Sequence, residues 1–95
     1  MPIWKLNPID LSHRDWEASR YQREVIVRAE SEERAQQIAA YAFGIATTVP
    51  LGEEVRASPW KQSTLVSITE VRDESYPRDG NEEIVGPPEA LEYIA

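Results

Sequence analysis

Cysteine is absent from this chain of 95 residues, and histidine occurs once, at position 13. Without cysteine there is no disulfide framework, no thiol nucleophile and no thiolate ligand for a metal ion. A structural zinc site draws its ligands mainly from several cysteines and histidines, so none is expected here. We therefore predict a protein that works without a metal or another cofactor, and whose composition suits a reducing compartment.

Long apolar stretches are also missing. No segment approaches the roughly 20 apolar residues that a helix needs to cross a bilayer. Residues 1–5 lack the apolar run of a secretory signal peptide. We expect a cytoplasmic protein that does not contact membranes.

Basic residues are scarce, because ten Lys and Arg stand against 17 Asp and Glu and leave a net charge of −7. Contact with a phosphate backbone requires clustered Lys and Arg, so direct nucleic-acid binding is not expected. Residues 70–95 alone hold eight acidic and two basic residues. This acidity favours solubility and is also compatible with a basic protein partner.

The clearest pattern is a strand that leads directly into a helix, over residues 21–47. Alternation in the strand puts Val25 and Val27 on a core face and leaves Ile26 on the water-facing side. Ser31 is suited to cap the N-terminus of a helix over residues 31–47. Apolar residues at helical spacing then form one stripe that would pack on a sheet. The stripe consists of Ala35, Ile38, Ala39, Ala42, Ile45 and Ala46.

Three further segments have strand character. Residues 63–72 form a second clear strand, with apolar residues on both of its faces. Residues 3–6 suggest a short strand that we place at a sheet edge, because Pro2 and Pro8 flank it. Ile84 and Val85 suggest a brief strand within the acidic, loop-rich C-terminal segment 73–95.

These elements predict a single small α+β domain over residues 1–95. We expect a two-layer sandwich in which the helix at 31–47 packs on one face of a short, mostly antiparallel sheet of about three strands. The strand–helix–strand order resembles half of a ferredoxin-like unit, and this resemblance concerns the fold alone. The second sheet face then needs a cover from the C-terminal segment, a second copy or another partner.

The function that we predict is a non-enzymatic binding module or regulator, which docks to a protein partner or to its own copy. The three tryptophans of the chain lie beside regular elements, where they either close the ends of the core or anchor a partner. Acidic residues around such a contact would steer the partner. The predicted partner-binding residues are Trp16, Ile26 and Trp60, with an acidic rim of Asp73, Glu74, Glu82 and Glu83.

Two alternatives remain open. An acidic protein can imitate nucleic-acid phosphates and block a basic groove, as phage-encoded inhibitors of bacterial defence do. This requires the carboxylates of residues 53–54 and 70–92 to lie along one surface. A small enzyme would instead need a pocket that joins His13 to a carboxylate such as Asp73 or Glu70. We assign no catalytic residue.

Overall fold

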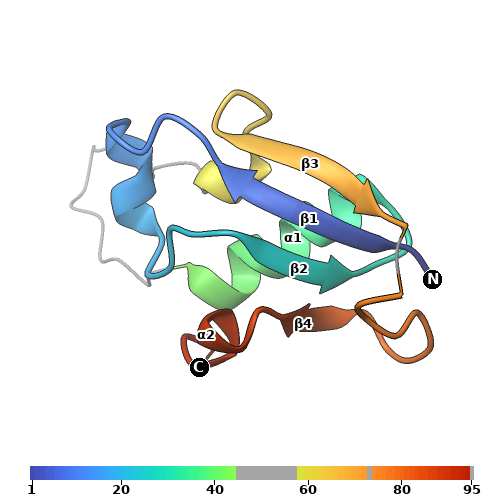
Figure 1. The fold of residues 1–95 in the computed structure, drawn as a ribbon. Helices are drawn as coiled ribbons and strands as arrows, with labels where there is room; N and C mark the ends of the chain where they lie inside the picture. Colours follow the sequence, from blue (N-terminus) through green and yellow to red (C-terminus); the bar gives the residue numbers. More distant parts are fainter. Residues whose placement is uncertain (45–57, 73, 95) are drawn as a thin grey trace.

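Four strands form one antiparallel sheet in the computed structural model, which describes residues 1–44, 58–72 and 74–94. The strands are β1 (Ile3–Pro8), β2 (Val25–Arg28), β3 (Val66–Val71) and β4 (Glu83–Gly86), in the spatial order β3-β1-β2-β4 (Figure 1). The predicted α+β class is confirmed, with four strands rather than three. In the part of the chain described, no helix is long and apolar enough to cross a membrane.

One main helix, α1 (Glu32–Phe43), packs on one face of the sheet (Figure 1). The predicted N-cap is confirmed, because the Ser31 hydroxyl accepts a hydrogen bond from the Arg34 backbone N–H at 3.2 Å. The helix ends at Phe43 with Gly44 as its C-cap, and residues 45–47 of the predicted helix lie outside the described residues. Three short helices complete the fold: η1 (Arg14–Ala18), η2 (Pro59–Lys61) and α2 (Pro88–Leu91).

The position of β1 corrects our prediction that it lies at a sheet edge. β1 pairs with β2 on one side and with β3 on the other. Pro2 lies just outside the strand and Pro8 is its last residue, opposite Val66. β2 begins with Val25 opposite Leu6 and does not extend to Pro8. A backbone N–H at position 8 would therefore have had no partner in β2. A proline at the end of a strand therefore does not exclude a central position.

Residues 74–82, which we call the covering loop, cover the second face of the sheet around Ile26 and Arg28, whereas Ser67 and Thr69 on the same face are exposed. Arg28 holds this loop, because its Nε donates to the carbonyl of Asn81 at 2.7 Å and its Nη1 to the carbonyl of Pro77 at 3.1 Å. Its Nη2 also donates to Glu83 Oε1 at 2.7 Å. The C-terminal segment thus supplies this cover itself, and the brief strand predicted at Ile84 and Val85 is confirmed as part of β4.

Candidate functional site

Trp16 and Trp60, two of the predicted partner contacts, lie in the core. They are 1% and 0% exposed, and their rings meet edge to face with centroids 5.2 Å apart. Burial is possible because each indole N–H has an acceptor: Ile9 O at 3.1 Å for Trp16 and Ser19 Oγ at 2.8 Å for Trp60. The interpretation that they close the core is therefore correct, and in this structure neither offers a surface to a partner.

Ile26, the third predicted apolar contact, is also buried, at 4% exposure. Our expectation that it faces water is wrong, although its place on the face opposite α1 is right. It pairs with Gly86 of β4, and the ring of Tyr76 lies so close to Gly86 that a Cβ there would be 2.6 Å from Tyr76 Cε1. The covering loop thus occupies the surface around Ile26 that our prediction assigns to a partner.

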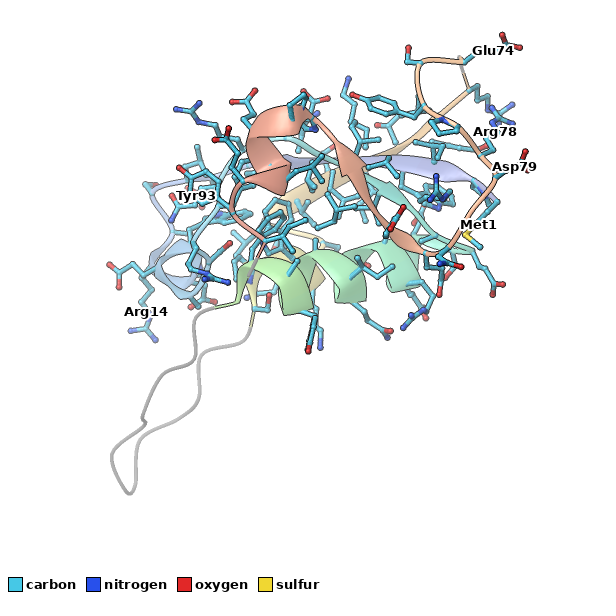
Figure 2. The ribbon with its side chains drawn as sticks, turned by 90° about the horizontal axis from the view of Figure 1, so that it is seen from below. Met1, Arg14, Glu74, Arg78, Asp79 and Tyr93 are labelled. Carbon is cyan, nitrogen blue, oxygen red and sulfur yellow. The ribbon has the colours of Figure 1, made fainter. Side chains whose placement is uncertain are left out.

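The predicted acidic rim is divided among several intramolecular roles. Glu83 pairs with the buried Arg28, and Glu82 pairs with Arg34 at 3.0 Å. The Arg34 guanidinium, followed by the backbone N–H of Glu30, lowers the pKa of Glu82 below its usual value. Glu74 points into solvent from the covering loop (Figure 2), and Asp73 lies outside the described residues. The two paired carboxylates carry less free charge for a partner than the sequence suggested.

His13 serves as a helix cap. Its Nδ1 accepts from the backbone N–H of Asp15 at 3.1 Å, at the start of η1. It follows the end of β1, whereas Glu70 pairs with Trp4 near the start of that strand. The four residue steps from Trp4 to Pro8 span about 13 Å of strand, so His13 and Glu70 lie toward opposite ends of the sheet. The other proposed carboxylate, Asp73, is not among the described residues.

Tyr21 has a perturbed ionisation that is structural in origin. Burial, followed by the nearby carboxylate of Glu89, raises its pKa from 10.0 to about 12. The phenol donates to the carbonyl of Glu24 at 2.6 Å and packs on Phe43, with ring centroids 4.8 Å apart. The group is therefore neutral near neutral pH and acts as a buried donor rather than as a base.

An apolar groove of about 900 Å³ runs between α1 and α2. Tyr41 on α1 is 93% exposed at its border, and Leu91 and Ile94 add partly exposed apolar surface from the C-terminal end. Arg34 and Glu82, which pair with each other, also line it. Among the described residues, this groove is the first surface that we consider for contact with another polypeptide.

The second surface is the outer edge of β3, and its hydrogen-bonding pattern follows from the strand register. Ile9 N donates to Leu65 O at 2.9 Å, one residue beyond the pair Pro8–Val66. Facing residues of an antiparallel pair alternate between hydrogen-bonded and non-bonded pairs. The inward-bonding residues of β3 are therefore Ser67, Thr69 and Val71, and the outward ones are Val66, Ile68 and Glu70.

Nothing in the described chain pairs with this outer edge. No described residue donates to or accepts from the outward backbone groups of Val66, Ile68 and Glu70, and no described helix or strand lies beyond β3 (Figure 1). The strand contains neither proline nor lysine. Glu70 is its one charged residue, and the Arg72 guanidinium lies 3.8 Å from it.

The opposite edge, β4, is shorter and is bounded by residues that hinder strand pairing. It has four residues, begins with the charged Glu83 and is followed by Pro87 and Pro88. Its pairing with β2 is also interrupted by a register shift between Ile26 and Val27. Short length, charge, proline and bulges are the features by which sheet edges avoid pairing with other chains. The sheet therefore has one protected edge and one open edge.

Sequence reasoning missed the β3 edge because alternation identifies faces but not neighbours. The signal that was available is composition: Val66–Val71 reads VSITEV, a β-branched run with a single charge. Comparisons with family models, with curated proteins and with solved structures found nothing that matches this chain.

Proposed function

We propose that this chain is a non-enzymatic protein-binding module that accepts a strand of another polypeptide along the outer edge of β3. The observation that carries the proposal is the open row of backbone groups at Val66, Ile68 and Glu70, on a six-residue strand that contains no proline, no lysine and no register shift. An added strand would satisfy these groups by main-chain hydrogen bonds, which is how many domains bind extended peptides.

The surrounding structure supports binding rather than catalysis. The one histidine caps a turn, the perturbed tyrosine is a buried donor, and the acids at positions 82 and 83 are paired with arginines. β3 itself is held firmly, since β1 pairs along its whole length. A rigid strand loses little conformational entropy when a partner adds to it.

The test is affinity capture from the native cell with three forms of the chain as bait. In Glu70→Pro the outward N–H is removed, and the ring projects where a partner strand would lie, while every hydrogen bond to β1 is kept. Glu70→Ala removes the same carboxylate but keeps the N–H, and so is the matched control. We expect proteins that are retained by the native and Glu70→Ala chains and lost with Glu70→Pro.

A fourth bait, Tyr41→Ser, tests the groove between α1 and α2, because Tyr41 is its most exposed apolar residue. Retention that depends on Tyr41 but not on the N–H of residue 70 would move the docking surface to the groove and refute the proposal. Amide hydrogen exchange on the captured complex supplies the positive evidence. Protection must appear at Val66, Ile68 and Glu70.

A further inference from the structure

The partner that fits this edge is a second copy of the chain, an inference that rests on the proposed function and specifies it. We infer that β3 pairs antiparallel with β3 of another copy, about a two-fold axis at Ile68. Six β-stranded residues with alternating bonding direction permit only registers in which outward residues oppose outward residues. The hydrogen-bonding phase of β3 thus restricts how two copies can meet.

The register centred on Ile68 uses every outward group. It places Ile68 opposite itself and Val66 opposite Glu70 of the other copy, so that all three outward residues exchange hydrogen bonds. If the axis moves to Ser67 or Thr69, one of the three outward residues has no partner within β3 of the other copy. Moving it to Glu70 would set two carboxylates directly opposite each other, which is destabilising.

Side chains in this register are compatible on both faces. On the side of α1, half-buried Ile68 would meet its own counterpart and extend the apolar layer across the junction. On the other side, Ser67 would face Thr69, two exposed hydroxyl residues that can hydrogen-bond. No like charges are brought together, so the edge is complementary to itself.

The distribution of charge favours a second copy over a basic peptide. On β3 the single carboxylate has an arginine 3.8 Å away, so the edge is nearly neutral. Two acidic pairs lie away from β3: Glu32 and Glu33 open α1, and Glu82 and Glu83 precede or begin β4 at the opposite edge. A basic strand would be attracted to the exposed Glu32 and Glu33 rather than to β3.

The test uses the absence of native cysteine. Ser67→Cys and Thr69→Cys are both exposed substitutions, and the inferred register places these positions opposite each other as a non-bonded pair, about 4.5 Å between Cα atoms. That spacing allows a disulfide, whereas two copies of the same variant would hold their sulfurs on a diagonal of roughly 7–8 Å. We expect covalent dimers when the two variants are mixed, at least roughly tenfold faster than with either alone.

Light scattering of the native chain completes the experiment. The mass should rise with concentration from 10.8 kDa toward twice that value, and Glu70→Pro but not Glu70→Ala should abolish the rise. A strict monomer without cross-links in the mixture overturns self-pairing, and so does a dimer that Glu70→Pro leaves intact. The proposed function is judged separately by whether Glu70→Pro removes captured proteins other than the chain itself.

Discussion

Arg28 and Ser19 are the buried polar residues among those described, and Arg28 alone is charged. Its side chain is 6% exposed, yet the guanidinium has three acceptors within 3.1 Å, at Pro77, Asn81 and Glu83. Burial of a charge is tolerated when its donors are all directed at acceptors. The planar guanidinium of arginine donates to three acceptors in fixed directions, and the ammonium group of lysine would not reproduce this geometry. A single residue of β2 thus holds a loop that lies about 50 residues later in the chain.

Replacing Arg28 by Met keeps a long apolar stem and removes these donors. We expect Arg28→Met to lower the free energy of unfolding by about 2–4 kcal/mol. The carbonyls of Pro77 and Asn81 lose a charged donor and cannot both regain a hydrogen bond to water. Urea unfolding measures the change. Arg34→Met is the matched control, since its pair with Glu82 is exposed to solvent and should cost clearly less. Equal losses for the two variants would show that the buried contacts of Arg28 have no special weight.

Among elements, the helix was the most predictable and the sheet edges the least. Ser31 and the alanine stripe identify where α1 starts and which side it buries, because both signals are local. The central place of β1 and the pairing of β4 with β2 depend on partners far away in sequence, so local pattern did not predict them. Alternation separated the two faces around Ile26 correctly. Local pattern did not show that Ile26 is covered, because the covering loop lies about 50 residues later in the chain.

The same reasoning explains how much of the site was foreseen. Composition pointed to binding, but the three apolar side chains chosen as contacts became core, since large apolar residues are buried wherever the fold allows. A binding edge made of backbone groups carries no distinctive side chain. It becomes visible only when the register shows which groups of Val66–Val71 point outward.

The covering loop depends on one glycine. Gly80 has φ +126°, in the left-handed region, and a Cβ there would lie 2.5 Å from Nη2 of Arg28. We expect Gly80→Ala to cost roughly 1–3 kcal/mol in unfolding free energy, from backbone strain and displacement of the guanidinium. Faster amide exchange of β4 should accompany the loss. Asp79→Ala, an exposed neighbour in the same loop, should change the stability by less than about 0.5 kcal/mol, and a similar loss there would refute the explanation.

At the scale of the whole molecule, neutral and acidic surfaces are separated. Each chain carries −7, so two copies repel each other at long range even though the β3 edge is nearly neutral. Short-range strand pairing and long-range repulsion respond differently to salt, because ions screen only interactions beyond about a Debye length. Salt dependence therefore separates pairing between copies from binding of a basic partner.

We expect the dissociation constant of the β3-mediated dimer to fall several-fold between about 0.01 M and about 0.15 M salt, as the Debye length shortens from roughly 30 to 8 Å. Sedimentation equilibrium at the two salt concentrations measures it. The double variant Glu33→Gln and Glu92→Gln, with two exposed acids neutralised outside β3, should dimerise more tightly at low salt and equally at high salt. A basic partner would give the opposite trend, with affinity lost as salt rises. Weaker dimerisation at high salt would mean that attraction between opposite charges, and not pairing of neutral edges, holds the two copies together.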